Sequence, residues 1–236
     1  PVDDSLSVYV FDTFIDGLDG NRNLFTKLEY EKISKHRLKL DNYILQNDCS
    51  FMNDFVSMYQ FALERKKNIL DKIRIEALDY NGKDTVKFSK KNFPFELVST
   101  DFDRVWKKRM KYDILEDISK LSSNLDSLNQ NFATLEKTAK AKIFECNLCK
   151  INNILESKKG IGYDLQNDFL NIFCSYFDPH TNFFSQDARS SFMSSLTTSG
   201  LSLGLNVTLN EKEEIIIDEV VPGGPAARTN KFEKGD

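Results

Sequence analysis

Two cysteines three residues apart offer the first candidate chemistry in this 236-residue chain. Cys146 and Cys149 form a Cys-x-x-Cys motif, and on a helix this spacing places both thiols on one face. A zinc site needs a second pair of ligands, and a redox pair usually opens a helix beside a strand. Because neither context is present, we interpret both residues as buried structural cysteines and predict no metal and no cofactor.

A short acidic and amide-rich segment could in principle bind calcium. Asp19, Asn21 and Asn23 match the first ligand positions of a calcium-binding loop. The sixth position is Leu24 instead of glycine, and the twelfth is Tyr30 instead of glutamate, so the sharp turn and the bidentate ligand are both missing. The segment is therefore predicted to be a plain turn.

His180 is the third candidate, in the segment Asp178-Pro179-His180-Thr181. A histidine can act as a general base, but no serine or cysteine nucleophile motif accompanies it. A histidine next to a turn proline is more often held by hydrogen bonds for structural reasons. We predict the structural role and name no catalytic residue.

The elements that must position these residues are mostly helices. Apolar residues recur every three to four positions, which indicates amphipathic helices. A capping box of Thr26 and Glu29 starts one predicted helix that continues through Ile44. The other predicted helices cover residues 4–18, 51–77, 102–118, 128–158 and 164–177, with caps at 99–101 and at Asp164.

Three details complete this helical region. The basic cluster 64–67 is predicted to be a solvated helix face. Residues 85–88 are a candidate short edge strand between helices. Trp106 is predicted to be a core residue, because a single tryptophan on an apolar stripe usually packs inside.

The last 37 residues change character. Apolar residues alternate with polar ones over 201–209, which is typical of a half-buried strand, and a second β-branched run covers 215–221. A polar turn, 210–214, joins them. Pro222-Gly223-Gly224-Pro225 then forms a tight loop, and Pro225 begins a short helix because its missing N–H is harmless in a first turn. The prediction is a hairpin followed by a loop and a helix.

Composition limits the class of protein. The chain is 40% hydrophobic and 29% charged, which is typical of a folded globular protein, and its net charge of -4 argues against a nucleic-acid partner. No apolar run approaches the roughly 20 residues that span a bilayer, so no transmembrane segment is predicted. The first residue is Pro1 and no signal peptide precedes it, so we expect a trimmed or mature chain.

Several of these strings resemble a known family. Ser202-Leu203-Gly204-Leu205, the segment 221–227 and Lys234-Gly235-Asp236 resemble the first half of a PDZ domain from C-terminal processing, or tail-specific, serine proteases. Phe177-Asp178-Pro179-His180-Thr181 resembles the segment that precedes this PDZ domain, and the helix beginning at Trp106 resembles one in the bacterial branch. The chain departs from the family at Ser202, where many members carry glycine, and at Asp19-Gly20, where they carry Asp-Pro.

The resemblance implies a fold and a binding site. It implies a mainly α protein with a helical domain over 1–177, a connector over 178–199 and an incomplete PDZ domain over 200–236. In such domains a hydrophobic-Gly-hydrophobic loop presents backbone N–H groups to the terminal carboxylate of a peptide, which then adds to the strand edge. The implied site consists of Ser202, Leu203, Gly204, Leu205, Asn206 and Val207.

The implied function is that of a part of an enzyme. The parent protein would be an exported serine endopeptidase of the bacterial periplasm or cell envelope, which recognises polypeptide substrates by their C-terminal residues and could use an adaptor protein. Its nucleophilic serine and basic lysine would follow the PDZ domain, beyond Asp236. An alternative from another class is a PDZ-containing binding scaffold without proteolysis.

We predict that the chain alone has no peptidase activity, because nucleophile, base and oxyanion donors would all lie outside it. Incubation with casein should give no cleavage above a buffer control, and serine-directed covalent probes should leave the chain unlabelled. Specific labelling of any serine in this chain would contradict the assignment.

Overall fold

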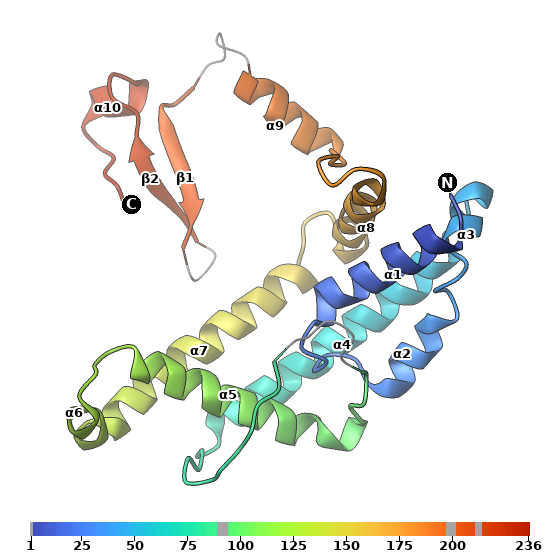
Figure 1. Cartoon of the computed structure of the whole chain (residues 1–236). Coiled ribbons are helices and arrows are strands. Elements are labelled where there is room, and N and C mark those ends of the chain that lie inside the picture. The colour runs from blue at the N-terminus through green and yellow to red at the C-terminus, as the bar shows by residue number, and fades with distance from the viewer. Residues whose placement is uncertain (1, 89–93, 197–201, 211–213) are drawn as a thin grey trace. The chain divides into compact units, whose positions relative to one another are not determined.

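The computed structural model describes residues 2–88, 94–196, 202–210 and 214–236 (Figure 1). The chain divides into two compact units, Pro1–Phe183 and Phe184–Asp236. The described residues form ten α-helices, one 3-10 turn and one two-stranded antiparallel sheet. The predicted fold class, mainly α with a small β segment near the end, is confirmed.

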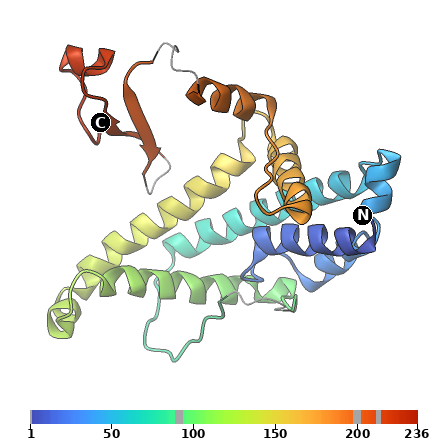
Figure 2. The ribbon, with the colours of Figure 1, turned by 45° about the horizontal axis from the view of Figure 1, so that its top comes forward.

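All the regular secondary structure in the described part of the first unit is helical. Its elements are α1 (Asp4–Asp19), α2 (Lys27–Ser34), α3 (Leu40–Gln46), α4 (Ser50–Ile75), η1 (Ser99–Asp101), α5 (Phe102–Ser119), α6 (Leu125–Gln130), α7 (Phe132–Leu155) and α8 (Ile161–Phe177). The long helix α4 is central to the unit and packs against α5, α7 and α8, while α1 packs against α3 and α8 (Figure 2). No helix in the described parts of the chain combines the length and the apolar character needed to cross a bilayer.

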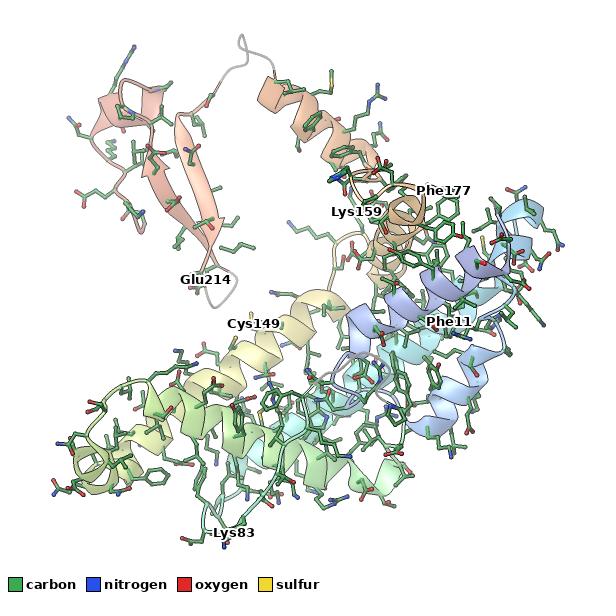
Figure 3. The ribbon with its side chains drawn as sticks, viewed as in Figure 1. Phe11, Lys83, Cys149, Lys159, Phe177 and Glu214 are labelled. Atoms are coloured by element: carbon green, nitrogen blue, oxygen red, sulfur yellow. The ribbon has the colours of Figure 1, made fainter. Side chains whose placement is uncertain are left out.

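An aromatic cluster holds α1, α4 and α8 together. Phe14 of α1 contacts Phe55 of α4 and Phe169 of α8, with ring centroids 5.0 and 5.7 Å apart. Phe11, labelled in Figure 3, lies 5.9 Å from Phe51. Tilted and edge-on contacts of this kind add to the free energy gained by burying the rings. The apolar spacing that predicted these helices therefore reflects a shared core.

The predicted helix from Thr26 to Ile44 is wrong in one respect, because it is two helices. The capping box is present, with the Glu29 N–H bonded to Thr26 Oγ1 at 3.1 Å, but α2 ends at Ser34. His36 then turns inward and is almost fully buried. Its ring nitrogens lie 2.9 Å from Tyr43 Oη and 3.2 Å from Asp54 Oδ2. This polar anchor fixes the turn that separates α2 from α3.

Other local predictions also need correction. The predicted helix 128–158 is interrupted at Asn131, whose side-chain amide bonds the Ser127 carbonyl at 2.9 Å. Helix α8 begins after Gly160, which has φ +85°, so Asp164 lies inside the helix and does not cap it. Residues 85–88 form no strand. The connector 178–199 contains an unpredicted helix, α9 (Gln186–Leu196).

The prediction that 64–67 forms a solvated face is wrong for two of its members. Arg65 donates to both Glu29 oxygens, at 2.6 and 2.9 Å, and to the Leu24 carbonyl at 2.6 Å. Its guanidinium also lies 4.1 Å from the centroid of the Phe102 ring. Lys66 lies over the Trp106 ring. Helix α5 covers this side of α4, and charge patterning along one helix cannot reveal such a neighbour. Trp106 is 4% exposed, as predicted.

The second unit consists of α9, β1 (Leu205–Leu209), β2 (Ile215–Val220) and α10 (Pro225–Thr229). The strands pair antiparallel, with Leu205 opposite Val220 and Leu209 opposite Ile215, and the register shifts between Asn206 and Val207. Pro225 begins α10, as predicted. Leu201 and residues 211–213 of the predicted strand and turn lie outside the described residues.

Replacement of Arg65 tests how much the covered basic face stabilises the first unit. Arg65→Ala should lower the free energy of unfolding by about 2 to 3 kcal/mol, because Glu29 and the Leu24 carbonyl lose a charged donor in a half-buried site. The matched control on the same helix is Arg74→Ala, whose exposed ion pair with Asp71 should contribute less than about 1 kcal/mol. Urea unfolding followed by circular dichroism gives both values. Equal losses would mean that the Arg65 contacts add no stability.

Candidate peptide-binding site

The predicted site residues are brought together at the start of the hairpin, around Gly204. Gly204 is buried and has φ +72°, a left-handed conformation that side chains rarely adopt. A Cβ at this position would lie 3.1 Å from Gly224 Cα and 3.4 Å from Pro225 Cδ. Position 204 thus requires a glycine for two reasons: its positive φ and its close approach to the loop after β2.

Two backbone hydrogen bonds close this loop onto the start of β1. The Val221 N–H donates to the Gly204 carbonyl at 2.9 Å, and the Ala226 N–H donates to the Leu203 carbonyl, also at 2.9 Å. Sequence analysis treated Gly223-Gly224 as a simple tight loop and missed its contact with Gly204. A glycine in each of two loops is the signal that could have indicated a close backbone approach.

The amides of the loop differ in availability. The Gly204 N–H bonds the Ser202 side chain, with N and Oγ 3.0 Å apart. The Leu203 N–H has no partner among the residues that the structure describes, and the Leu203 side chain is 74% exposed. Ser202, where the family often carries glycine, therefore occupies one of the donors expected to bind a carboxylate.

The strand that follows has an open edge. In this two-stranded sheet β1 pairs only with β2 over the described residues, so its other edge carries unpaired backbone groups. Asn206 bonds Glu219 across the pair at 3.0 Å, and Val207, opposite Ile217, is 58% exposed. The other edge of β2 is engaged at Ile217, which bonds both Asp236 and Gly235 through its backbone.

The other sequence candidates lie in the first unit, away from this loop in the chain. His180 has an exposed side chain, and the bond to Asp178 Oδ1, at 3.0 Å, comes from its backbone N–H, so the structural role predicted for the side chain stays a prediction. Cys146 and Cys149 lie on α7 and are only half-buried, less than predicted (Figure 3). Asp19 ends α1 and accepts three backbone N–H bonds, so the turn after it is built around one carboxylate.

Comparison with known proteins finds both a matching family and a similar protein. Residues 1–187 match the family described as "Tail specific protease N-terminal domain". The Tail-specific protease of Haemophilus influenzae is 30% identical over 239 residues, an alignment that spans all of this chain and 32% of the relative. The chain thus covers about a third of that relative's length.

These two findings together establish the family. The chain belongs to the tail-specific protease family, and the resemblance drawn from its sequence is confirmed.

The close contact between Gly204 and Gly224 predicts that a side chain at position 204 destabilises the loop. Gly204→Ala should speed hydrogen exchange of the Val221 and Ala226 amides by about tenfold more than Gly223→Ala does, because both changes strain a positive φ but only the first crowds a backbone. Gly223, with φ +79° and open space around it, is the matched control. Exchange measured by NMR or mass spectrometry decides, and equal acceleration would show that the contact does not constrain the loop.

Proposed function

We propose that the parent of this chain is an exported serine endopeptidase of the Ser-Lys type, and that this chain is its non-catalytic N-terminal and substrate-recognition portion. Membership of the tail-specific protease family supports the protease activity. The observation that carries the recognition role is the left-handed Gly204 placed directly before the open edge of β1.

Recognition would proceed by anion binding followed by strand addition. A peptide's terminal carboxylate binds the amides of Leu203, Gly204 and Leu205, and its preceding residues extend along Asn206 and Val207. A carboxylate accepts stronger hydrogen bonds than a neutral hydroxyl does, so it displaces Ser202 Oγ from the Gly204 N–H. The exposed side chains of Leu203 and Val207 offer apolar contacts to the peptide.

The domain arrangement proposed here follows the sequence. Residues 1–177 form the helical domain, 178–199 the connector and 200–236 the incomplete PDZ domain. The substrates are polypeptides read by their C-termini, an adaptor protein is a further partner, and the setting is the periplasm or cell envelope. A non-proteolytic PDZ scaffold is the competing proposal, and a serine with a lysine several turns later in the parent sequence would exclude it.

Peptides that differ only in their terminal group test the binding site. In the full-length protein, a peptide with a free C-terminal carboxylate should bind at least about tenfold more tightly than its amide, because charged hydrogen bonds contribute about 1.5 to 3 kcal/mol each. Calorimetric titration measures both affinities. Equal affinities for acid and amide would mean that the loop does not bind carboxylates.

Ser202→Ala gives a second test of the binding site, because it removes only the hydroxyl group and changes no glycine of the loop. Removing Oγ frees the Gly204 N–H, so affinity for the free-acid peptide should rise about two- to fivefold, the value of one neutral hydrogen bond. Affinity for the amide should change less. A fall in affinity would show that the hydroxyl itself binds the peptide.

A further inference from the structure

A polar cavity inside the helical unit is independent of the peptide-binding loop. It has a volume of about 440 Å³ and lies between the last turn of α1 and the helices α4, α5 and α7. Each of these elements contributes at least one charged side chain: Asp16, Asp19, Lys66, Arg109, Asp113 and Lys150. Three cations and three carboxylates therefore line one space.

The carboxylates of this cavity already have partners. Asp19 accepts the N–H groups of Asn23, Leu24 and Phe25 at 2.8 to 3.1 Å. Asp16 pairs with Arg22. Asp113 pairs with Arg109 Nε at 3.0 Å. Each acid is thus occupied by a backbone or side-chain donor, and none is paired with Lys66.

The cations, in contrast, keep unused donors. The Lys66 side chain is half-buried and makes no hydrogen bond or ion pair with the residues that the structure describes; its Nζ lies 4.4 Å from the centroid of the Trp106 ring. Arg109 Nη1 is buried, also without a hydrogen-bond partner among the described residues. A buried cationic donor without a partner is costly, so Arg109 Nη1, next to the half-buried ammonium of Lys66, points to a ligand that supplies acceptors.

The pKa of Lys66 reflects the same imbalance. Burial is the main cause that lowers the pKa of Lys66 from 10.5 to about 8; the cations Arg109 and Lys150 also lower it, while Asp19 and Asp113 raise it. An anion bound beside the ammonium would raise this pKa again. The lowered pKa agrees with the lack of an acidic partner for Lys66 among the described residues.

The other lining residues indicate which kind of anion fits the cavity. Tyr59, Leu63, Ile151 and Ile154 give the cavity an apolar wall. A dianion such as phosphate would face three carboxylates, whereas a monoanion with a carbon chain meets less repulsion and buries apolar surface. We propose that this cavity binds a small organic carboxylate with a short apolar chain, held by Lys66 and Arg109.

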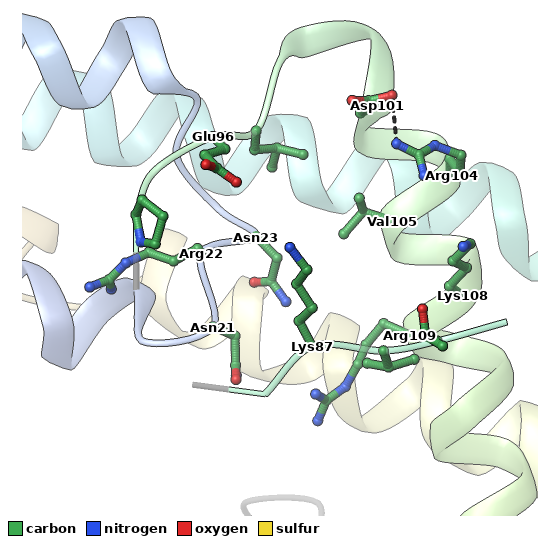
Figure 4. A pocket seen from close by; sticks show the side chains of 14 residues that line it. Asn21, Arg22, Asn23, Lys87, Glu96, Asp101, Arg104, Val105, Lys108 and Arg109 are labelled. Atoms are coloured by element: carbon green, nitrogen blue, oxygen red, sulfur yellow. Dashed lines mark ion pairs between the residues drawn. The ribbon is translucent and has the colours of Figure 1, made fainter. Parts of the chain in front are cut away.

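A neighbouring pocket is also lined by cations, but two of them are already paired with carboxylates. Its lining includes Arg109, which borders both pockets, and also Arg104 and Lys108; Arg104 pairs with Asp101 at 3.0 Å (Figure 4) and Lys108 pairs with Asp84 at 3.4 Å. Those two cations already have acidic partners. Lys66 is set apart by the absence of such a partner within the described residues.

The single tryptophan of the chain reports directly on this cavity, because Trp106 lies against Lys66. Titration of the 236-residue chain with hexanoate should change Trp106 fluorescence saturably, with hexanamide at least tenfold weaker. Calorimetry run in parallel detects binding that leaves the fluorescence unchanged. Equal affinity for hexanoate and hexanamide, no saturable signal by either method, or phosphate binding as tight as hexanoate would each overturn the proposal.

Variants assign the binding to Lys66. Lys66→Met keeps the length and apolar stem of the side chain and removes the ammonium, so hexanoate affinity should fall at least tenfold. Lys67→Met, the adjacent change on α4, should alter affinity less than twofold, because Lys67 does not line this cavity. Circular dichroism checks that both variants fold. Undiminished binding to folded Lys66→Met would exclude this lysine, and the acid-amide comparison on the unaltered chain requires no variant.

Discussion

The ion pair between Glu29 and Arg65 joins α2 to α4, and further contacts of Arg65 extend it to the turn at Leu24 and to α5. Glu29 completes the capping box that begins α2, so the same carboxylate that starts one helix also receives the guanidinium of another. Arg65 adds a bond to the turn at Leu24 and a ring contact with Phe102 of α5. The position of the Arg65 guanidinium thus links the start of α2, the start of α5 and the turn at Leu24 to the central helix α4. The desolvation of such a pair is offset by the hydrogen bonds that its groups make, and Arg65 uses both Nη1 and Nη2 in this way, while its buried Nε has no hydrogen-bond partner among the described residues.

Periodic patterns allowed much of this helical unit to be predicted. The apolar stripe of α5 correctly placed Phe102, Met110 and Ile114 in the core, because one face of an isolated helix can be deduced from its spacing alone. The break after Ser34 could not be predicted, since it depends on His36 meeting Asp54, eighteen residues later in the chain. The covered face of Arg65 and Lys66 was missed for the same reason. Sequence spacing describes one helix, whereas burial depends on what packs against it.

The hairpin was predictable in a different way. Alternation of apolar residues identified the first strand, a run of β-branched residues the second, and the glycines the loop, but the direct approach of Gly204 to Gly224 is a relation between two loops. The bond between Ser202 and the Gly204 N–H is similar, because a serine at that position suggests only a polar side chain. The residues of the candidate site could therefore be named from sequence, while the availability of their amides required the structure.

The backbone bonds between Ile217 and the last two residues have a consequence for solubility. A sheet with two open edges can polymerise without limit, because each added molecule presents a fresh edge to the next. Here the outer edge of β2 is engaged at Ile217, whereas the outer edge of β1 is unpaired over the described residues. Association of two molecules through β1 would use the open edge of both, so it would stop at pairs.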